Sequence, residues 1–238
     1  MLNKSMKSIC FIAARGGSKG VSKKNIRFFV NKPLIAHTIE KSINSKIFDH
    51  VIVSTEDPEI AKIAKEYGAE IPFIRPKKLA SDKSGMFDVM IHGITKLKSM
   101  GYDFDLFVNR DCTAPFIRNI DISNSIKLLE KTKSNAVFGV YRQHFNPYFN
   151  MMESNKNGFL KISKSKGKRP QSRQTAPIVY QLNGYFVYDV KSLLKYREQF
   201  IMPKVLPYEI PEETGLMIDT EMEFKLAELM VKNKLIAI

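Results

Sequence analysis

The sequence contains no tryptophan and only two cysteines, Cys10 and Cys112. Two cysteines cannot form the disulfide framework of a small secreted domain, and both lie in apolar segments, so we expect buried free thiols in a reducing compartment. Long apolar runs are also absent, because no stretch approaches the roughly 18 residues that a membrane-spanning helix needs. The apolar segment at 8–14 is short and leads into a charged loop, unlike a signal peptide. We therefore expect a soluble, cytoplasmic protein that does not enter membranes.

Acidic residues are scarce relative to basic ones, with 24 aspartates and glutamates against 38 lysines and arginines and a net charge of +14. Such an excess favours an anionic partner: nucleic acid, acidic lipid or a phosphorylated small molecule. The basic residues are spread along the chain, with local concentrations at 19–27 and 161–173. No aromatic and basic motif of an RNA-binding sheet occurs, and a solvated lysine-rich surface explains most of the excess. A nucleic-acid partner is therefore not expected.

The periodicity of apolar residues alternates between strand-like and helix-like segments. Strands are predicted at 9–13, 51–54, 71–74, 105–109, 135–141, 179–188 and 205–208. Helices are predicted at 33–43, 58–67, 86–97, 119–131, 190–197 and 220–233. Because strands and helices alternate through the first 141 residues, the pattern predicts an α/β fold with a largely parallel sheet and helices on both faces.

Residues 142–180 interrupt this alternation. They contain three prolines, the polar run 153–158 and the basic run 161–170. This composition favours an inserted arm of hairpin or loop character over a separate domain. We therefore predict a single domain spanning 1–238, with 142–180 as an arm inserted into it.

The most informative segment is the loop at 14–25, which follows the first predicted strand. Its three glycines, at 16, 17 and 20, allow the backbone to expose consecutive N–H groups to an anion. Parallel sheets bind ligands at the carboxyl ends of their strands, and a triphosphate suits the basic residues Arg15, Lys19 and Lys24. Neither the Walker A nor the dinucleotide-binding glycine pattern is present. By spacing alone, a solvated flexible loop is an equal alternative.

A set of short motifs extends in a fixed order from this loop to the last predicted helix. They are Ala14-Arg-x-Gly-Ser-Lys-Gly20, Lys24-Asn25, Lys32-Pro-Leu-Ile35, Val53-Ser-Thr-Glu-Asp57, Tyr67-Gly-Ala-Glu70, Phe73-Ile-Arg-Pro76, Leu79-Ala-Ser-Asp82, Thr113-Ala-Pro115, Ser172-Arg-Gln174, Asn183-Gly184 and Ile218-Asp-Thr220. Together they resemble the CMP-sugar synthetases, and most closely the acylneuraminate (nonulosonate) cytidylyltransferases. The combination is specific, although no single motif is. The resemblance implies a Rossmann-like nucleotide-diphospho-sugar transferase fold.

The activity implied by the resemblance is that of a CTP-dependent nucleotidyltransferase. Such an enzyme transfers CMP from CTP to the anomeric hydroxyl of a nine-carbon 2-keto acid sugar of the sialic, legionaminic or pseudaminic acid type, releasing pyrophosphate. The resemblance also implies Mg²⁺, which neutralises the triphosphate, and a homodimer in which the arm pairs with a second subunit and closes its sugar site. Two alternatives are open: a cytidylyltransferase for another acidic sugar such as Kdo, and a basic nucleic-acid-binding protein.

The resemblance assigns roles to individual residues. The catalytic residues that it implies are Arg15, Lys24 and Asp219. The nucleotide-binding residues are Ala14, Arg15, Gly16, Gly17, Ser18, Lys19, Lys24, Asn25, Arg75, Leu79, Ala80 and Ser81. The sugar-binding residues are Asp111, Thr113, Arg173, Gln181 and Asn183. The metal ligand is Asp219, with Asp111 as a second candidate.

Three positions depart from the pattern of the sialic acid enzymes. Met217 replaces the first aspartate of the usual Asp-x-Asp-Thr, Asp111 stands where glutamine is usual, and Phe149 stands where lysine is frequent. These departures favour a nonulosonic acid other than ordinary sialic acid, such as legionaminic or pseudaminic acid. They also leave open whether Asp111 binds a metal, accepts hydrogen bonds from the sugar or forms a salt bridge with Arg110.

Two further groups of residues have simpler structural interpretations. Asp57 precedes Pro58 at a predicted helix start, so we expect it to cap that helix rather than to act in the site. The four histidines are scattered along the chain, and we expect core or surface roles for all of them. No general base is therefore evident from the sequence.

Overall fold

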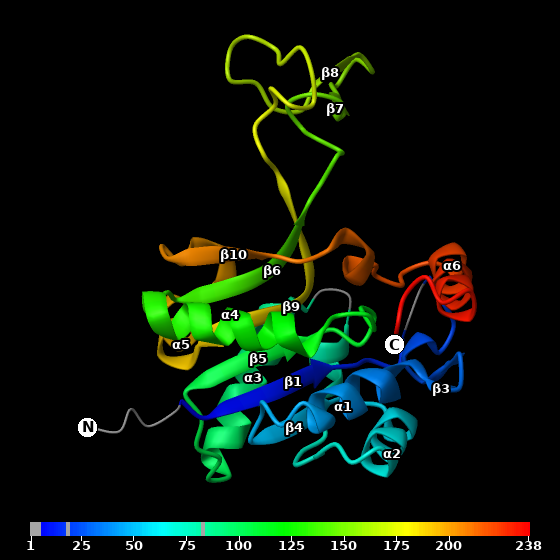
Figure 1. Ribbon diagram of the computed structural model, residues 1–238. Coiled ribbons are helices and arrows are strands. Elements are labelled where there is room, and N and C mark those ends of the chain that lie inside the picture. The colour runs from blue at the N-terminus through cyan, green and yellow to red at the C-terminus, as the bar shows by residue number, and fades with distance from the viewer. Residues whose placement is uncertain (1–5, 18–19, 82–83) are drawn as a thin grey trace.

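The computed structural model describes residues 6–17, 20–81 and 84–238, and its centre is a six-stranded sheet of order β10-β6-β9-β5-β1-β4 (Figure 1). The strands are β1 (Ser8–Ala13), β4 (His50–Ser54), β5 (Leu106–Arg110), β6 (Ala136–Arg142), β9 (Tyr180–Asp189) and β10 (Val205–Glu209). β9 runs antiparallel to β5 and β6, whereas the other three pairs are parallel. The prediction of a largely parallel sheet is confirmed.

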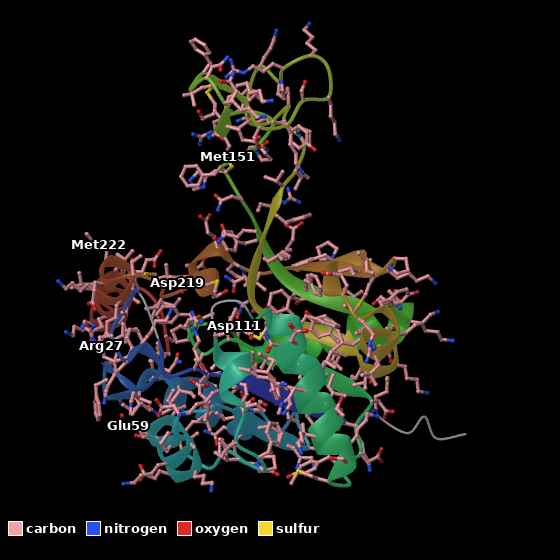
Figure 2. The ribbon with its side chains drawn as sticks, turned by 180° about the vertical axis from the view of Figure 1, so that it is seen from behind. Arg27, Glu59, Asp111, Met151, Asp219 and Met222 are labelled. Carbon is pink, nitrogen blue, oxygen red and sulfur yellow. The ribbon has the colours of Figure 1, made fainter. Side chains whose placement is uncertain are left out.

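Helices cover both faces of the sheet, as the strand sequences dictate. In β1, Ile9 and Phe11 point to one face and Cys10 and Ile12 to the other, and all four side chains are fully buried. The first face packs against α3 (Met86–Ser99) and α5 (Val190–Tyr196). The second packs against α1 (Leu34–Asn44), α2 (Pro58–Glu66) and α4 (Asn119–Thr132), and Figures 1 and 2 show the two faces in turn.

Two helices that begin near the carboxyl end of the sheet start at side-chain caps. The Asp57 carboxylate accepts the N–H groups of Glu59 and Ile60 at the start of α2, so the predicted cap is confirmed. Thr220 and Glu223 form a reciprocal capping box at the start of α6 (Glu221–Lys232). These caps matter for the site because each helix begins directly after a segment that reaches the carboxyl end of the sheet.

The predicted strand at 71–74 is wrong. Among the described residues, only an isolated bridge between Ile52 and Glu70 forms at that edge of β4. Pro72 has no N–H to donate to a strand ladder, which explains why pairing stops there. The chain continues instead into the short 3-10 helix η2 (Lys77–Ala80). A small hairpin of β2 (Phe28–Phe29) and β3 (Lys32–Pro33), which periodicity did not predict, joins the first loop to α1.

The chain between β6 and β9 leaves the sheet and projects as an arm above it (Figure 1). Near its tip, β7 (Met152–Ser154) and β8 (Leu160–Ile162) form an antiparallel hairpin. Several large apolar side chains of this arm are exposed, namely Phe145, Met151, Met152, Phe159 and Leu160. Across the described residues, no helix is long and apolar enough to span a membrane.

Candidate active site

A cavity of about 520 Å³ among the described residues lies at the carboxyl ends of β1 and β5. The chain leaves β1 to form β4 on one side and later returns to form β5 on the other, so this is the point at which the strand order reverses. Open α/β sheets bind ligands at such a switch point because the loops diverge there. The predicted site residues that line the cavity are Arg15, Lys24, Asn25, Arg75, Leu79, Ala80, Ser81, Asp111, Thr113 and Asp219.

The start of the loop after β1 is held by side chains from separate parts of the chain. Asn25 donates from Nδ2 to the carbonyl oxygen of Arg15 at 2.9 Å, and the Cys112 thiol in turn donates to the Asn25 Oδ1 at 3.2 Å. Arg75 donates to the carbonyl oxygen of Ala14 at 3.0 Å. The backbone from which the Arg15 side chain projects toward the cavity is therefore fixed before any ligand binds.

Lys24 joins this loop to the segment before α6. Its Nζ donates to the carbonyl oxygen of Ile218 and to Oδ1 of Asp219, both at 2.8 Å. Gly20 approaches the same segment so closely that a Cβ built on it would lie 2.0 Å from the main-chain oxygen of Asp219. The cation expected to bind phosphate and the carboxylate expected to bind metal thus form one ion pair at the cavity wall.

Asp111 stands at the end of β5 and shares the cavity with Asp219 (Figure 2). Burial, together with the negative charge of Asp219 and against a hydrogen bond from Asn109, raises the pKa of Asp111 to about 6. The guanidinium of the neighbouring Arg110 instead donates hydrogen bonds to the side chains of Ser42 and Asn119 and to the carbonyl oxygen of Ile117. The alternative in which Asp111 forms a salt bridge with Arg110 is therefore wrong.

Two cations hold the main chain of the 111–117 loop from behind. Arg110 is fully buried and donates to the carbonyl oxygen of Ile117 at 3.1 Å, and Lys41 donates to that of Pro115 at 2.9 Å. Burial, followed by the charge of Arg110, lowers the pKa of Lys41 to about 8. Ile218 completes the attachment by donating its N–H to the carbonyl oxygen of Thr113 at 2.8 Å.

The two carboxylates fit a magnesium ion in number and chemistry. Among the described residues, no group of three or more histidine, cysteine, aspartate or glutamate side chains gathers to hold a metal. Mg²⁺ commonly takes only one or two protein carboxylates and completes its octahedron with water and substrate phosphates. Asp111 and Asp219 supply hard oxygen donors of this kind beside a cavity with cationic side chains.

Several predicted residues do not reach the cavity within this chain. Ala14 is buried beneath it, and Gly16 lies beside Asp57 in a separate depression of about 70 Å³. Gly17 is exposed, with open space around it. Ser18 and Lys19 lie outside the described residues.

The sugar-binding candidates divide between the cavity and other places. Asp111 and Thr113 line it, but Arg173 and Gln181 are exposed, on the arm and at the start of β9. Asn183 is fully buried and donates from Nδ2 to the carbonyl oxygen of Gly215, while its Oδ1 has no partner among the described residues.

The cavity also contains residues that the sequence did not single out as functional. They are Ala13, Ser84, Met86, Val89 and Cys112, and Gly20 of the predicted anion loop lines the cavity as well. Because Cys112 follows Asp111 directly, its position in the sequence could have indicated that this buried thiol also lines the cavity. Met86 and Val89 gave no such signal, because their spacing is also that of the buried face of α3. No histidine is among the described residues that line this wall.

Similarity to known proteins covers nearly the whole chain. The family model described as cytidylyltransferase matches residues 9–228. Post-translational flagellin modification protein B of Campylobacter coli is 33% identical over 229 residues, 95% of each protein. CMP-N,N'-diacetyllegionaminic acid synthase of Campylobacter jejuni is 33% identical over 227 residues, again 95% of each. The solved structure of CMP:2-keto-3-deoxy-manno-octonic acid synthetase complexed with CTP shares the fold, with a TM-score of 0.73 and 16% identity over 96% of this chain and 99% of that one.

Proposed function

The chain belongs to the cytidylyltransferase family, and from this premise we propose that it transfers CMP from CTP to the anomeric hydroxyl of a nine-carbon 2-keto acid sugar. The observation that carries the proposal is the cavity at the β1 and β5 ends, where Arg15 and Lys24 share a wall with Asp111 and Asp219. A volume of about 520 Å³ lies within the range of small-molecule sites.

In the proposed reaction, the anomeric hydroxyl gives up its proton to water, and its oxygen forms a bond to the α-phosphorus of CTP. The bond from that phosphorus to the oxygen bridging the β-phosphate breaks, and pyrophosphate leaves. Such a transfer depends on positioning and on neutralising charge more than on covalent help from the protein. Arg15 offers a planar fork to phosphate oxygens and Lys24 a point charge, so these two side chains bind and orient the triphosphate.

Asp219 would hold Mg²⁺ in this site, and Asp111 is either its second ligand or an acceptor for the sugar hydroxyls. The ion would supply positive charge to the triphosphate. In the free protein Lys24 neutralises Asp219, so the carboxylate is held at the cavity wall without a metal. Phosphate and Asp219 therefore compete for the same ammonium group when CTP binds.

We propose legionaminic or pseudaminic acid as the sugar rather than ordinary sialic acid. Met217 and Phe149 put apolar side chains where the sialic acid enzymes carry polar ones, which suits a sugar with a deoxygenated C9. Similarity to the legionaminic acid synthase of Campylobacter jejuni supports this choice. The raised pKa of Asp111 suits an acceptor of sugar hydroxyl hydrogen bonds in a weakly hydrated place.

We propose that two copies form a homodimer through the arm. The exposed apolar side chains of the arm, among them Phe159 and Leu160, favour burial against another surface. Arg173 and Gln181 would then bind the sugar in the partner copy's site. Asn183 would bind the sugar at the base of the arm. We place the reaction in the cytoplasm, in line with the two buried free thiols.

The test is an assay of pyrophosphate release with CTP, Mg²⁺ and a panel of acids: N,N'-diacetyllegionaminic, pseudaminic and N-acetylneuraminic acid, and Kdo. We expect turnover with one of the first two acids and a loss of about 100-fold or more in Arg15→Ala. A clear preference for N-acetylneuraminic acid overturns the sugar assignment. Turnover with Kdo alone identifies the eight-carbon alternative. Salt-sensitive oligonucleotide binding that survives Arg15→Ala, without CTP turnover, overturns the enzyme proposal.

A further inference from the structure

Glu56 lies just behind the cavity wall, between the end of β4 and the start of α2. Its side chain is 13% exposed, and both of its carboxylate oxygens are used. Oε1 accepts the backbone N–H of Gly16 at 2.8 Å, and Oε2 accepts a hydrogen from Nη2 of Arg75 at 2.7 Å. One carboxylate thus bridges the loop after β1 and the wall that continues into η2.

Arg75 depends on this carboxylate for its charge balance. Its side chain is 3% exposed, and its Nε has no hydrogen-bond partner among the described residues. The Nη2 that reaches Glu56 also donates to the carbonyl oxygen of Ala14 at 3.0 Å. A buried guanidinium is costly unless it is paired, so Glu56 is what allows Arg75 to stand in the wall.

The consequence for the loop is that three successive residues are held from the side. Arg75 binds the oxygen of Ala14, Asn25 the oxygen of Arg15, and Glu56 the nitrogen of Gly16. Glu56 takes part in two of these three attachments, directly or through Arg75. It therefore sets the orientation of the peptide from which the Arg15 side chain enters the cavity.

We propose that Glu56 is a positioning residue for the nucleotide, acting through Arg75 and the Gly16 amide rather than by touching the ligand. This inference rests on the proposed function. It requires a carboxylate at position 56, because both partners are donors. A glutamine of the same shape has only one acceptor oxygen, so its NH₂ group faces either Gly16 or Arg75 and leaves a buried donor unpaired.

The test compares Glu56→Gln with Glu59→Gln. Glu59 is the matched control, because it lies three residues further on, is exposed and pairs with Lys23 at 2.7 Å on the surface. The measurements are the Kd for CTP by calorimetry, the KM values for CTP and for the sugar, kcat, and the melting temperature. We expect Glu56→Gln to raise the Kd and KM for CTP by about 10-fold to 100-fold, as for a lost charge-assisted hydrogen bond, and to leave the KM for the sugar within about 2-fold. Glu59→Gln should match the wild type.

A second variant and a second measurement guard against failure of Glu56→Gln to fold. Glu56→Asp keeps the charge beside Arg75 but is one methylene too short to reach both donors. It should weaken CTP binding by about 5-fold or more, with faster hydrogen exchange in the peptide that covers residues 14–17. We therefore expect Glu56→Asp to restore the melting temperature but not the affinity for CTP.

The outcomes separate this inference from the proposed function. If the wild type turns over CTP and either Glu56 variant binds CTP with wild-type affinity, the positioning role is overturned. The same holds if the variants lose affinity for both substrates equally, in step with a lower melting temperature, because that pattern marks a purely structural residue. If the wild type and Glu59→Gln neither bind nor turn over CTP, the proposed function itself fails.

Discussion

Replacing Gly20 by alanine tests whether the loop after β1 and the segment before α6 must touch for catalysis. The added Cβ would lie 2.0 Å from the main-chain oxygen of Asp219 and 3.2 Å from its carbonyl carbon. Non-bonded carbon and oxygen atoms do not approach this closely, so the two segments must separate by about 1 Å or more. That separation pulls Lys24 away from Ile218 and Asp219, to which it is bonded at 2.8 Å.

We expect kcat/KM for CTP to fall about 100-fold in Gly20→Ala, the effect of misplacing catalytic groups by about 1 Å. Stability should change little, with a melting temperature within about 3 °C, because position 20 and Asp219 are both exposed. Gly17→Ala is the matched control in the same loop, since nothing lies within 4 Å of a Cβ built there. Wild-type kcat/KM in Gly20→Ala, or equal damage in Gly17→Ala, would refute the reasoning.

Two further predictions concern the support of the site. Gly139→Ala would place a Cβ 2.3 Å from the ring of the buried Tyr185. We therefore expect it to cost about 1–3 kcal/mol of stability and to lower the melting temperature by several degrees. An unchanged melting temperature in calorimetry would contradict this. Burial, followed by the charge of Arg110, lowers the pKa of Lys41 to about 8. Above that pH the unfolded chain binds more protons than the folded chain, so the free energy of unfolding rises with pH up to the ordinary pKa of lysine. Lys41→Met should remove about 1–2 kcal/mol of that rise between about pH 7.5 and 9.5 in urea unfolding, and identical pH profiles for both proteins would show that the amine does not titrate there.

Local sequence patterns were sufficient to predict the helices and strands that have a clear pattern of apolar residues or a side-chain cap. The strand at 9–13 and the helix at 86–97 were predicted within two residues of their ends, because a short continuous apolar run indicates a strand buried on both faces and a period of 3.6 indicates the buried face of a helix. Asp57 identified the start of α2 for a similar reason, since a cap bonds to N–H groups only two and three residues away. The segment at 71–74 failed because the apolar residues around Pro72 resemble a strand while the proline itself cannot pair.

The site itself was anticipated through resemblance rather than through physics alone. The spacing of the residues at 14–25 alone did not decide between an anion-binding loop and a solvated loop. The ordered motifs then indicated Arg15, Lys24 and Asp219, which line one cavity. Glu56 belongs to one of these motifs, but nothing in the sequence showed that Gly16 and Arg75 would donate hydrogen bonds to both of its oxygens.

By itself, the sequence determined the fold class, the order of the six sheet strands and of the α-helices, the Asp57 cap and the family, because these depend on residues close together in the chain or on the order of short motifs. Only the tertiary structure decided that Lys24 pairs with Asp219, 195 positions away, and that Arg173 and Gln181 stand outside the cavity of their own chain. Such pairings depend on how the strands are ordered in the sheet and on where the arm leaves it. No local period or cap records a contact of that range.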